Sequence, residues 1–332
     1  MLNCELVVDA GSGYVTIYQK GLGVVLKEPA IAIVVPGAKK LSLKAAGTKA
    51  KKLIGKTVGL EQVVYPFKAG SIVNHEVALL MMKDFVARIA DGGALRHKIT
   101  ALIPVCSGLS LAERRAYETL FSRLGFSEVI LVDSPNTAAR LIPENSGLVI
   151  NVGSSVTEFA IVAQTGIING CSVDLAGDEY TQLVLEHLEQ TCGLKVGFFT
   201  AERIKHTIMS LYPGDTSLCE VTGRDYLGSP KTITLHSGDL YDKAAALTDN
   251  IVEVTRTMLS YLPPEMTEDV INKGIYLYGG SAELAGLKEY LEKALSLTVN
   301  VLPDPSNVVV TGGAKLLSAR DVLGDILDLK NL

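Results

Sequence analysis

Two short segments carry residues suited to holding phosphate groups. The first is a hairpin pattern over residues 6–18, in which Asp9 is followed by a turn containing Gly11, Ser12 and Gly13. Glycine lets the backbone of such a turn come close to a ligand, and the N–H groups at its mouth suit an anion. The natural ligand of this segment is a phosphate.

The second segment repeats the pattern about half a chain later. Over residues 147–162 an apolar run reaches Asn151, and Gly153, Ser154 and Ser155 form the turn before a second alternating run. The repeat suggests an internal duplication, in which one loop from each half holds opposite sides of a polyphosphate. Neither loop has the G-x-x-x-x-G-K-[ST] pattern, and neither leads directly into a helix as a dinucleotide fingerprint does. Either turn taken alone also fits an ordinary hairpin.

A third glycine turn follows a buried strand expected over residues 274–278. Gly279, Gly280 and Ser281 come next, and a helical pattern is expected directly after them. Backbone of this kind can lie flat against a ring or an α-phosphate, and a helix N-terminus favours anionic groups. The three turns together predict a nucleotide cradle.

The elements between these turns alternate between strand and helix. In the first half, strands are expected at 21–27, 30–36, 99–105 and 128–132, with helices at 74–90, 111–124 and 135–141. In the second half, helices are expected at 179–193, 200–211, 237–262 and 309–317, with a β-hairpin over 219–235. Strands alternating with helices imply parallel pairing in an α/β domain.

Composition narrows the class of protein. The chain has 332 residues, which favours about two domains, and 48% hydrophobic with 20% charged residues indicates a soluble globular protein. Its net charge of −5 offers no electrostatic footprint for nucleic acid, so no nucleic-acid partner is expected. The five cysteines form no C-x-x-C pair, which fits reduced thiols and argues against a disulfide framework or a zinc site. Without a signal-peptide pattern or a long apolar run, a cytoplasmic location is expected.

The three turns, in this order, resemble the two phosphate loops and the adenosine loop of the superfamily of actin, sugar kinases and heat-shock chaperone ATPases. Within that superfamily the chain is most similar to the MreB family of bacterial actins. The similarity extends over essentially the whole chain. It includes the runs PFKAGSIVNHEVALLMMKDF, IPVCSGLSLAERRA, VDSPNTAA, AGDEY, TAERIKHTIMSLYP, GRDYLGSPKTIT and DPSNVVVTGGAKLL.

The resemblance implies an α/β fold of the actin-like (ribonuclease H-like) kind, a duplicated two-domain fold with a central nucleotide cleft. Domain I is expected at 1–142 plus 318–332, with a small insert at about 37–64. Domain II is expected at 143–317, with an insert at about 181–245.

The resemblance also implies ATP and Mg²⁺ as ligands. Asp9 is then the carboxylate that holds Mg²⁺ through water. The implied nucleotide-binding residues are Gly11, Ser12 and Gly13, then Gly153, Ser154 and Ser155, with Glu202 and Lys205 beside the adenosine and Gly279, Gly280 and Ser281 at the base. Glu202 and Lys205, three apart on a helix, also fit an ordinary surface pair.

Two positions depart from the family pattern. Ser134 stands where the family usually carries a Glu that positions the attacking water, and Asn151 stands where the second loop usually begins with Asp. Phosphoryl transfer relies on positioning and electrostatics, so losing such a group costs about 10²-fold or more in rate. Slow or absent ATP hydrolysis is expected. Asp133 is a possible substitute, but its side chain should point the other way on the strand.

The family's members form paired filaments on the inner face of the cytoplasmic membrane and direct cell-wall synthesis and rod shape. The implied partners are therefore further copies of the chain, that membrane surface as a peripheral contact, and cell-wall elongation proteins. The loop over residues 90–98 offers only Ala94 and Leu95 as a membrane contact, and it also fits an ordinary solvent loop. Two alternatives are a chaperone-like or kinase-like ATPase of the same superfamily and a non-polymerising regulatory paralogue.

Overall fold

The computed structural model describes residues 3–38, 40–90 and 98–328. The chain divides into two compact units: unit 1 contains Met1–Ser146, Val162–Ser172 and Asn307–Leu332, and unit 2 contains Gly147–Ile161 and Val173–Ser306. Ala94 and Leu95, the residues considered for a membrane contact, lie outside the described residues. Among the described helices, none is both long and apolar enough to span a membrane.

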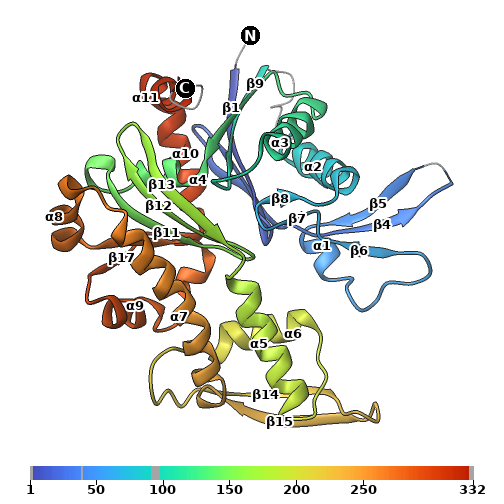
Figure 1. The fold of residues 1–332 in the computed structure, drawn as a ribbon. Helices are drawn as coiled ribbons and strands as arrows, with labels where there is room; N and C mark the ends of the chain where they lie inside the picture. The colour runs from blue at the N-terminus through green and yellow to red at the C-terminus, as the bar shows by residue number, and fades with distance from the viewer. Residues whose placement is uncertain (1–2, 39, 91–97, 329–332) are drawn as a thin grey trace. The chain divides into compact units, whose positions relative to one another are not determined.

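Unit 1 is built on a five-stranded sheet with the order β10-β9-β1-β2-β3. Figure 1 labels two of its strands, β1 and β9. β1 pairs antiparallel with β2 and parallel with β9, and β10 extends the parallel part. The strands are β1 (Asn3–Ala10), β2 (Tyr14–Gln19), β3 (Gly23–Pro29), β9 (Lys98–Val105) and β10 (Glu128–Asp133).

Helices cover both faces of this sheet. Successive residues of a strand point to opposite faces, so Leu6 and Val8 pack in one core cluster and Val7 in another. The first cluster includes residues of α2 and α3, and the second includes residues of α10 and α11. The helices of this unit are α2 (His75–Ala90), α3 (Leu111–Arg123), α4 (Ser134–Ala139), α10 (Val308–Ser318) and α11 (Arg320–Asp328).

Smaller elements complete unit 1. A three-stranded sheet has the order β5-β4-β6, and β7 pairs with β8 in a two-stranded hairpin. These elements are β4 (Ala32–Pro36), β5 (Leu41–Ala46), α1 (Thr48–Lys51), β6 (Gln62–Val64), β7 (Phe67–Lys68) and β8 (Ser71–Ile72).

The second five-stranded sheet has the order β13-β12-β11-β16-β17. It matches the first sheet strand for strand, with β11, β12 and β13 corresponding to β1, β2 and β3, and with β16 and β17 corresponding to β9 and β10. The strands are β11 (Gly147–Val152), β12 (Thr157–Ala163), β13 (Gly166–Val173), β16 (Ile275–Tyr278) and β17 (Val299–Val301). The two sheets share one strand order, as expected for the internal duplication that the glycine turns suggested.

Besides strands β11, β16 and β17, unit 2 contains five α-helices and a hairpin among the described residues (Figure 1). They are α5 (Gly177–Gln190), α6 (Phe198–Ile208), β14 (Leu218–Arg224), β15 (Pro230–His236), α7 (Gly238–Ser260), α8 (Pro264–Lys273) and α9 (Leu287–Leu295).

Three of the differences from the expectations drawn from sequence concern α8, the third glycine turn and β13. Pro263 and Pro264 end α7 but also begin a further helix, α8, because proline suits the first helical turn. The helix expected directly after Ser281 is instead a 3₁₀ turn over Gly280–Glu283, and α9 begins only at Leu287. Strand β13 was not predicted, because its alternation of half-buried and exposed positions lacks a strong apolar signal.

Candidate functional site

The first glycine turn connects β1 with β2 in unit 1. Asp9 lies at the end of β1, paired in register with Thr16, and is half-buried. Gly11, Ser12 and Gly13 form the turn, and the Gly13 carbonyl accepts a hydrogen bond from the Ala30 N–H at 2.9 Å. This places the predicted phosphate residues at the carboxyl end of β1, the usual place for ligands in an open α/β sheet.

Ser134 lies at the same sheet edge, because it begins α4 directly after β10. Its side chain is 5% exposed, and within the described residues its Oγ atom has no hydrogen-bond partner. The neighbouring Asp133 forms an ion pair with Arg114 of α3. The carboxylate next to Ser134 is therefore held by an arginine.

The second glycine turn connects β11 with β12 in unit 2. Gly153 donates its N–H to the carbonyl of Val156 at 3.0 Å, and Ser155 is 5% exposed. The Ser154 hydroxyl donates to Oδ1 of Asp178 at 3.0 Å. The turn is therefore held by one hydrogen bond within it and by a second one to Asp178, which lies outside it.

That attachment is to the N-terminus of α5. Gly177 donates its N–H to the Gly153 carbonyl at 3.1 Å, and Asp178 donates its N–H to the Ser154 carbonyl at 2.7 Å. The first N–H groups of a helix have no partner within the helix. Here two of them bind the carbonyl groups of the glycine turn, which anchors the turn to the start of α5.

Two more predicted residues converge on the same place. Lys205 of α6 donates from Nζ to the Gly177 carbonyl at 2.7 Å, and the Ser281 hydroxyl donates to the Gly153 carbonyl at 2.7 Å. A Cβ atom on Gly177 would lie only 2.6 Å from Ser281 Oγ, 3.2 Å from the Gly153 carbonyl oxygen and 3.4 Å from Lys205 Nζ. The structure therefore brings Gly153, Ser154, Lys205 and Ser281 together around Gly177.

Asp178 is a partly buried carboxylate within this cluster. Burial raises the pKa of Asp178 most strongly, while the hydrogen bond from Ser154 and the charge of Lys205 oppose the rise. The charges of Glu179 and Glu202 add to it, so Glu202 lies within electrostatic reach of the cluster. Sequence reasoning did not select Gly177 or Asp178, although the run AGDEY that contains them was a recognisable signal.

The two glycines of the third turn differ in their surroundings. Gly279 has φ of +93°, and a Cβ there would lie 2.4 Å from both Asn151 Oδ1 and the Val152 carbonyl oxygen. A Cβ on Gly280 would meet nothing within 4 Å. Gly279 is required by the backbone and its neighbours, whereas Gly280 borders open space.

Asn151 has a partner that sequence reasoning missed. Its Nδ2 donates to Oε2 of Glu158 at 3.0 Å, joining neighbouring strands β11 and β12. Glu158 is 3% exposed. The hairpin pattern of residues 147–162 would have placed these two positions on adjacent strands.

A hollow of about 160 Å³ opens beside the cluster in unit 2. Gly177, Lys205, Gly280 and Ser281 line one part of it. Its wall also includes Tyr180 of α5, the end of α6 with the segment that follows it, and the residues after Ser281, namely residues 206–210, Asp215, Ser217 and residues 283–285. This pocket shares Gly177, Lys205 and Ser281 with the cluster around the second glycine turn.

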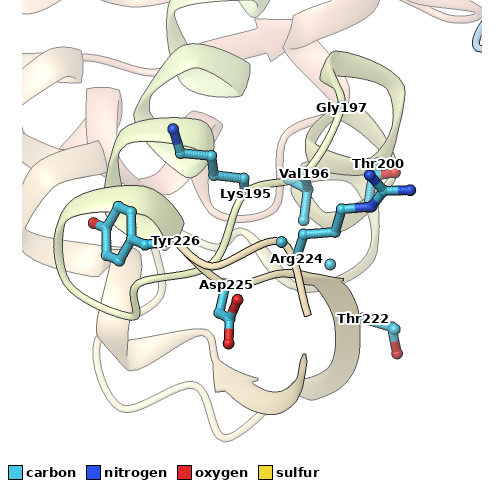
Figure 2. A pocket seen from close by; sticks show the side chains of 10 residues that line it. Lys195, Val196, Gly197, Thr200, Thr222, Arg224, Asp225 and Tyr226 are labelled. Carbon is cyan, nitrogen blue, oxygen red and sulfur yellow. The ribbon is translucent and has the colours of Figure 1, made fainter. Parts of the chain in front are cut away.

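A larger hollow, of about 510 Å³, lies elsewhere in unit 2 between residues 195–200 and the β14–β15 hairpin. Figure 2 shows Lys195 and Tyr226 on one side of it and Arg224 with Thr200 on the other. Its one carboxylate, Asp225, accepts from the N–H groups of Leu227 and Ser229 in its own turn. None of the candidate nucleotide-binding, metal-binding or catalytic residues named in the sequence analysis lines this hollow.

Comparison with known proteins identifies similar chains. A family model described as MreB/Mbl protein matches residues 3–324. The cell shape-determining protein MreB of Escherichia coli K12 is 32% identical over 334 residues, which cover 98% of this chain and 96% of that protein.

Solved structures agree with that match. MreB5 of Spiroplasma citri bound to ADP has a TM-score of 0.88 at 25% identity, covering 96% of this chain and 97% of that one. The MamK double helical filament has a TM-score of 0.79 at 18% identity, covering 96% and 99%, and shows the fold alone. The predicted actin-like α/β fold is confirmed.

Proposed function

Since the chain belongs to the MreB/Mbl family, we propose that it is a nucleotide-dependent, filament-forming bacterial actin that guides cell-wall synthesis and cell shape. The observation that carries the proposal is the family match, which spans residues 3–324. A match of that extent does not favour the chaperone-like, kinase-like or regulatory alternatives.

The proposed ligand is ATP. The ADP bound to the similar MreB5 supports an adenine nucleotide. In unit 2, the turn of Gly153 to Ser155 would bind phosphate, and the nearby pocket at Lys205 and Gly280 would take the adenosine. The first glycine turn, Gly11, Ser12 and Gly13 of unit 1, is also proposed to bind phosphate.

Mg²⁺ is proposed as the accompanying ion, and when bound it neutralises phosphate charge. This ion prefers oxygen ligands and keeps several waters, so a single carboxylate such as Asp9 fits its needs. Asp9 would hold the ion through water. The equivalent position in the second turn is the neutral Asn151, which offers no carboxylate.

Hydrolysis is proposed to be slow or absent. Ser134 has no carboxylate with which to position an attacking water, and Asp133 is paired with Arg114. These are positioning functions on which phosphoryl transfer depends. The state of the protein would then depend mainly on whether a nucleotide is bound, and less on whether that nucleotide has been hydrolysed.

The experiment that tests the proposal is electron microscopy of the purified protein with ATP on an anionic lipid layer. Paired filaments that need nucleotide are expected. In a filament, many copies of the chain would contact the inner face of the cytoplasmic membrane at the same time. Many weak contacts acting together can hold a peripheral cytoplasmic protein at that surface. Persistent monomers from well-folded, ATP-bound protein would contradict the filament proposal.

A further inference from the structure

One segment of unit 1 carries a strong local excess of positive charge. Residues 37–60 contain seven lysines and no aspartate or glutamate. Because the whole chain has a net charge of −5 and this segment carries +7, the remaining residues carry −12. Clusters of about four to eight basic residues are typical of contacts with anionic lipid headgroups. The charge of this segment therefore complements an anionic surface, whereas the charge of the rest of the chain does not.

Helix α1 and the turns after it expose three of these lysines. Lys49 and Lys52 lie three residues apart, which places them on one side of a helical turn. Lys56 ends the following turn, where its N–H donates to the Leu53 carbonyl at 3.0 Å. All three lysines are exposed, whereas Ala50 of α1 is fully buried. The segment thus packs on unit 1 through its apolar residues and keeps these lysines in contact with solvent.

The next turn adds two exposed apolar side chains, in the loop that leaves α1 and returns as β6 (Figure 1). Val58 is 69% exposed and Leu60 is 71% exposed. Glu61 closes the turn, because its Oε2 accepts from the Val58 N–H at 3.2 Å and its Oε1 pairs with Lys44 of β5. The turn is therefore held in place while both apolar side chains stay uncovered.

The carboxylates bonded to this segment are bound by groups other than the three exposed lysines. Glu61 is paired with Lys44. Glu28 accepts from the Thr48 hydroxyl at 2.6 Å and from Nη1 of Arg88 at 2.9 Å. Neither glutamate neutralises the exposed lysines, so their charge is available to an external anion.

We infer that Lys49, Lys52, Lys56, Val58 and Leu60 form the surface through which this chain contacts an anionic lipid bilayer. Lysine ammonium groups are attracted to anionic headgroups, and neighbouring apolar side chains can enter the boundary between headgroups and acyl chains. The two apolar side chains favour a bilayer over a nucleic acid, whose charged surface offers no such layer. This inference rests on the proposed function, because it names the surface by which the proposed filament reaches the membrane.

The first test is co-sedimentation of the full chain with lipid vesicles at low ionic strength, with and without ATP. One set of vesicles contains phosphatidylcholine alone, and the other contains phosphatidylcholine and phosphatidylglycerol in equal parts. The test variant carries Lys49→Gln, Lys52→Gln and Lys56→Gln. The matched control has the same change at three exposed lysines of α2, α7 and α9, namely Lys83, Lys243 and Lys293.

Wild type and the control are expected to sediment with the anionic vesicles only, and added salt should weaken this binding. The test variant should bind them at least about tenfold more weakly, because each lysine near an anionic membrane adds to the attraction. Equal binding by wild type and the test variant would overturn the inference. Lysine-dependent binding to single-stranded DNA, without binding to vesicles, would overturn it as well.

The same measurement separates this inference from the proposed function. Wild type that forms nucleotide-dependent filaments in solution but does not sediment with anionic vesicles would overturn the inference alone. Wild type that sediments with these vesicles through the three lysines, but forms no filaments with ATP, would contradict the proposed function alone.

A fluorescent reporter tests whether the apolar turn reaches the bilayer. The chain contains no tryptophan, so Leu60→Trp introduces a single one. Its emission should shift to shorter wavelength with the anionic vesicles and stay unchanged with phosphatidylcholine alone. Leu227→Trp is the control, because Leu227 is 92% exposed between β14 and β15 of unit 2, and its emission should not shift. Absence of a shift at position 60 in vesicle-bound protein would overturn the inference.

Discussion

The ammonium group of Lys205 donates a hydrogen bond to the backbone carbonyl of Gly177 at 2.7 Å, and both residues are buried. Gly177 in turn donates its N–H to Gly153 in the second phosphate turn. Lys205 is therefore linked to that turn through one residue, which gives it a structural role beside the binding role proposed above.

Replacing Lys205 should weaken the cluster locally. Lys205→Met keeps the length of the side chain but removes one donor to the buried Gly177 carbonyl, which still accepts from the Thr181 hydroxyl at 3.1 Å, so the cost is about 1 kcal/mol. Faster amide hydrogen exchange at the start of α5 should report this loss. Glu202→Gln, on the same helix and half-buried, should change exchange there by less than about 0.5 kcal/mol. Equal protection of α5 in wild type and Lys205→Met would contradict the assigned role.

The two glycines of the third turn should respond differently to alanine. Gly279→Ala should lower the melting temperature sharply, because its φ is +93° and its Cβ would collide with Asn151 and Val152. Gly280→Ala should leave the melting temperature nearly unchanged, because no atom lies within 4 Å of the added Cβ.

ATP affinity is the second readout for these glycines. Gly280→Ala should bind ATP about tenfold or more weakly, since the methyl group would occupy space proposed for the ligand. Gly238→Ala is the matched control, because its Cβ also meets nothing within 4 Å and it lies at the start of α7. Wild-type affinity in Gly280→Ala would place the nucleotide elsewhere.

Much of this site follows from local sequence. The two Gly and Ser turns and their flanking strands lie where the apolar alternation predicts them, and the shared strand order of the two sheets reflects their repetition. Lys205 and Ser281 were selected through the resemblance, since spacing along the chain does not bring α6 and the third turn to Gly153.

The features that sequence did not predict depend on tertiary packing. Gly177 is required because three polar groups from separate segments surround it, and no local pattern encodes that crowding. The extra helix α8 is instead a local feature, because Pro264 suits the first turn of a helix. The bond between Asn151 and Glu158 needs the register of two strands, which a residue-by-residue comparison with a family does not show.

The raised pKa of Asp178 should make the stability of the folded protein depend on pH. Its folded-state pKa is raised, chiefly by burial, so the folded state binds a proton more readily than the unfolded state. The protonated form therefore contributes stability at low pH, and this contribution is lost as pH rises through the folded-state pKa. Asp178→Asn should melt at a higher temperature than wild type near neutral pH, and the difference should shrink on acidification.

Melting curves of both proteins across acidic and neutral pH test this sign. A difference that grows as the pH falls would contradict it. Removing the charge should also strengthen ATP binding at neutral pH, because Asp178 lies beside the proposed phosphate turn. Unchanged affinity would mean that the carboxylate does not face the ligand.

Restoring the two missing carboxylates should speed hydrolysis. The double variant Ser134→Glu with Asn151→Asp is expected to hydrolyse bound ATP about 10²-fold faster than wild type in a single-turnover assay. Ser134→Gln with Asn151→Asp is the matched control, because it has the same shape at position 134 without the charge. Equal, brisk rates in wild type and both variants would show that Ser134 and Asn151 do not limit hydrolysis.

The central claim is that this family member binds a purine nucleotide at the turns described above. Isothermal titration of ATP into well-folded wild type and into Gly280→Ala tests it most directly. The account predicts one ATP per chain for wild type and binding about tenfold or more weaker for the variant. No detectable binding by folded wild type, with or without Mg²⁺, would contradict it.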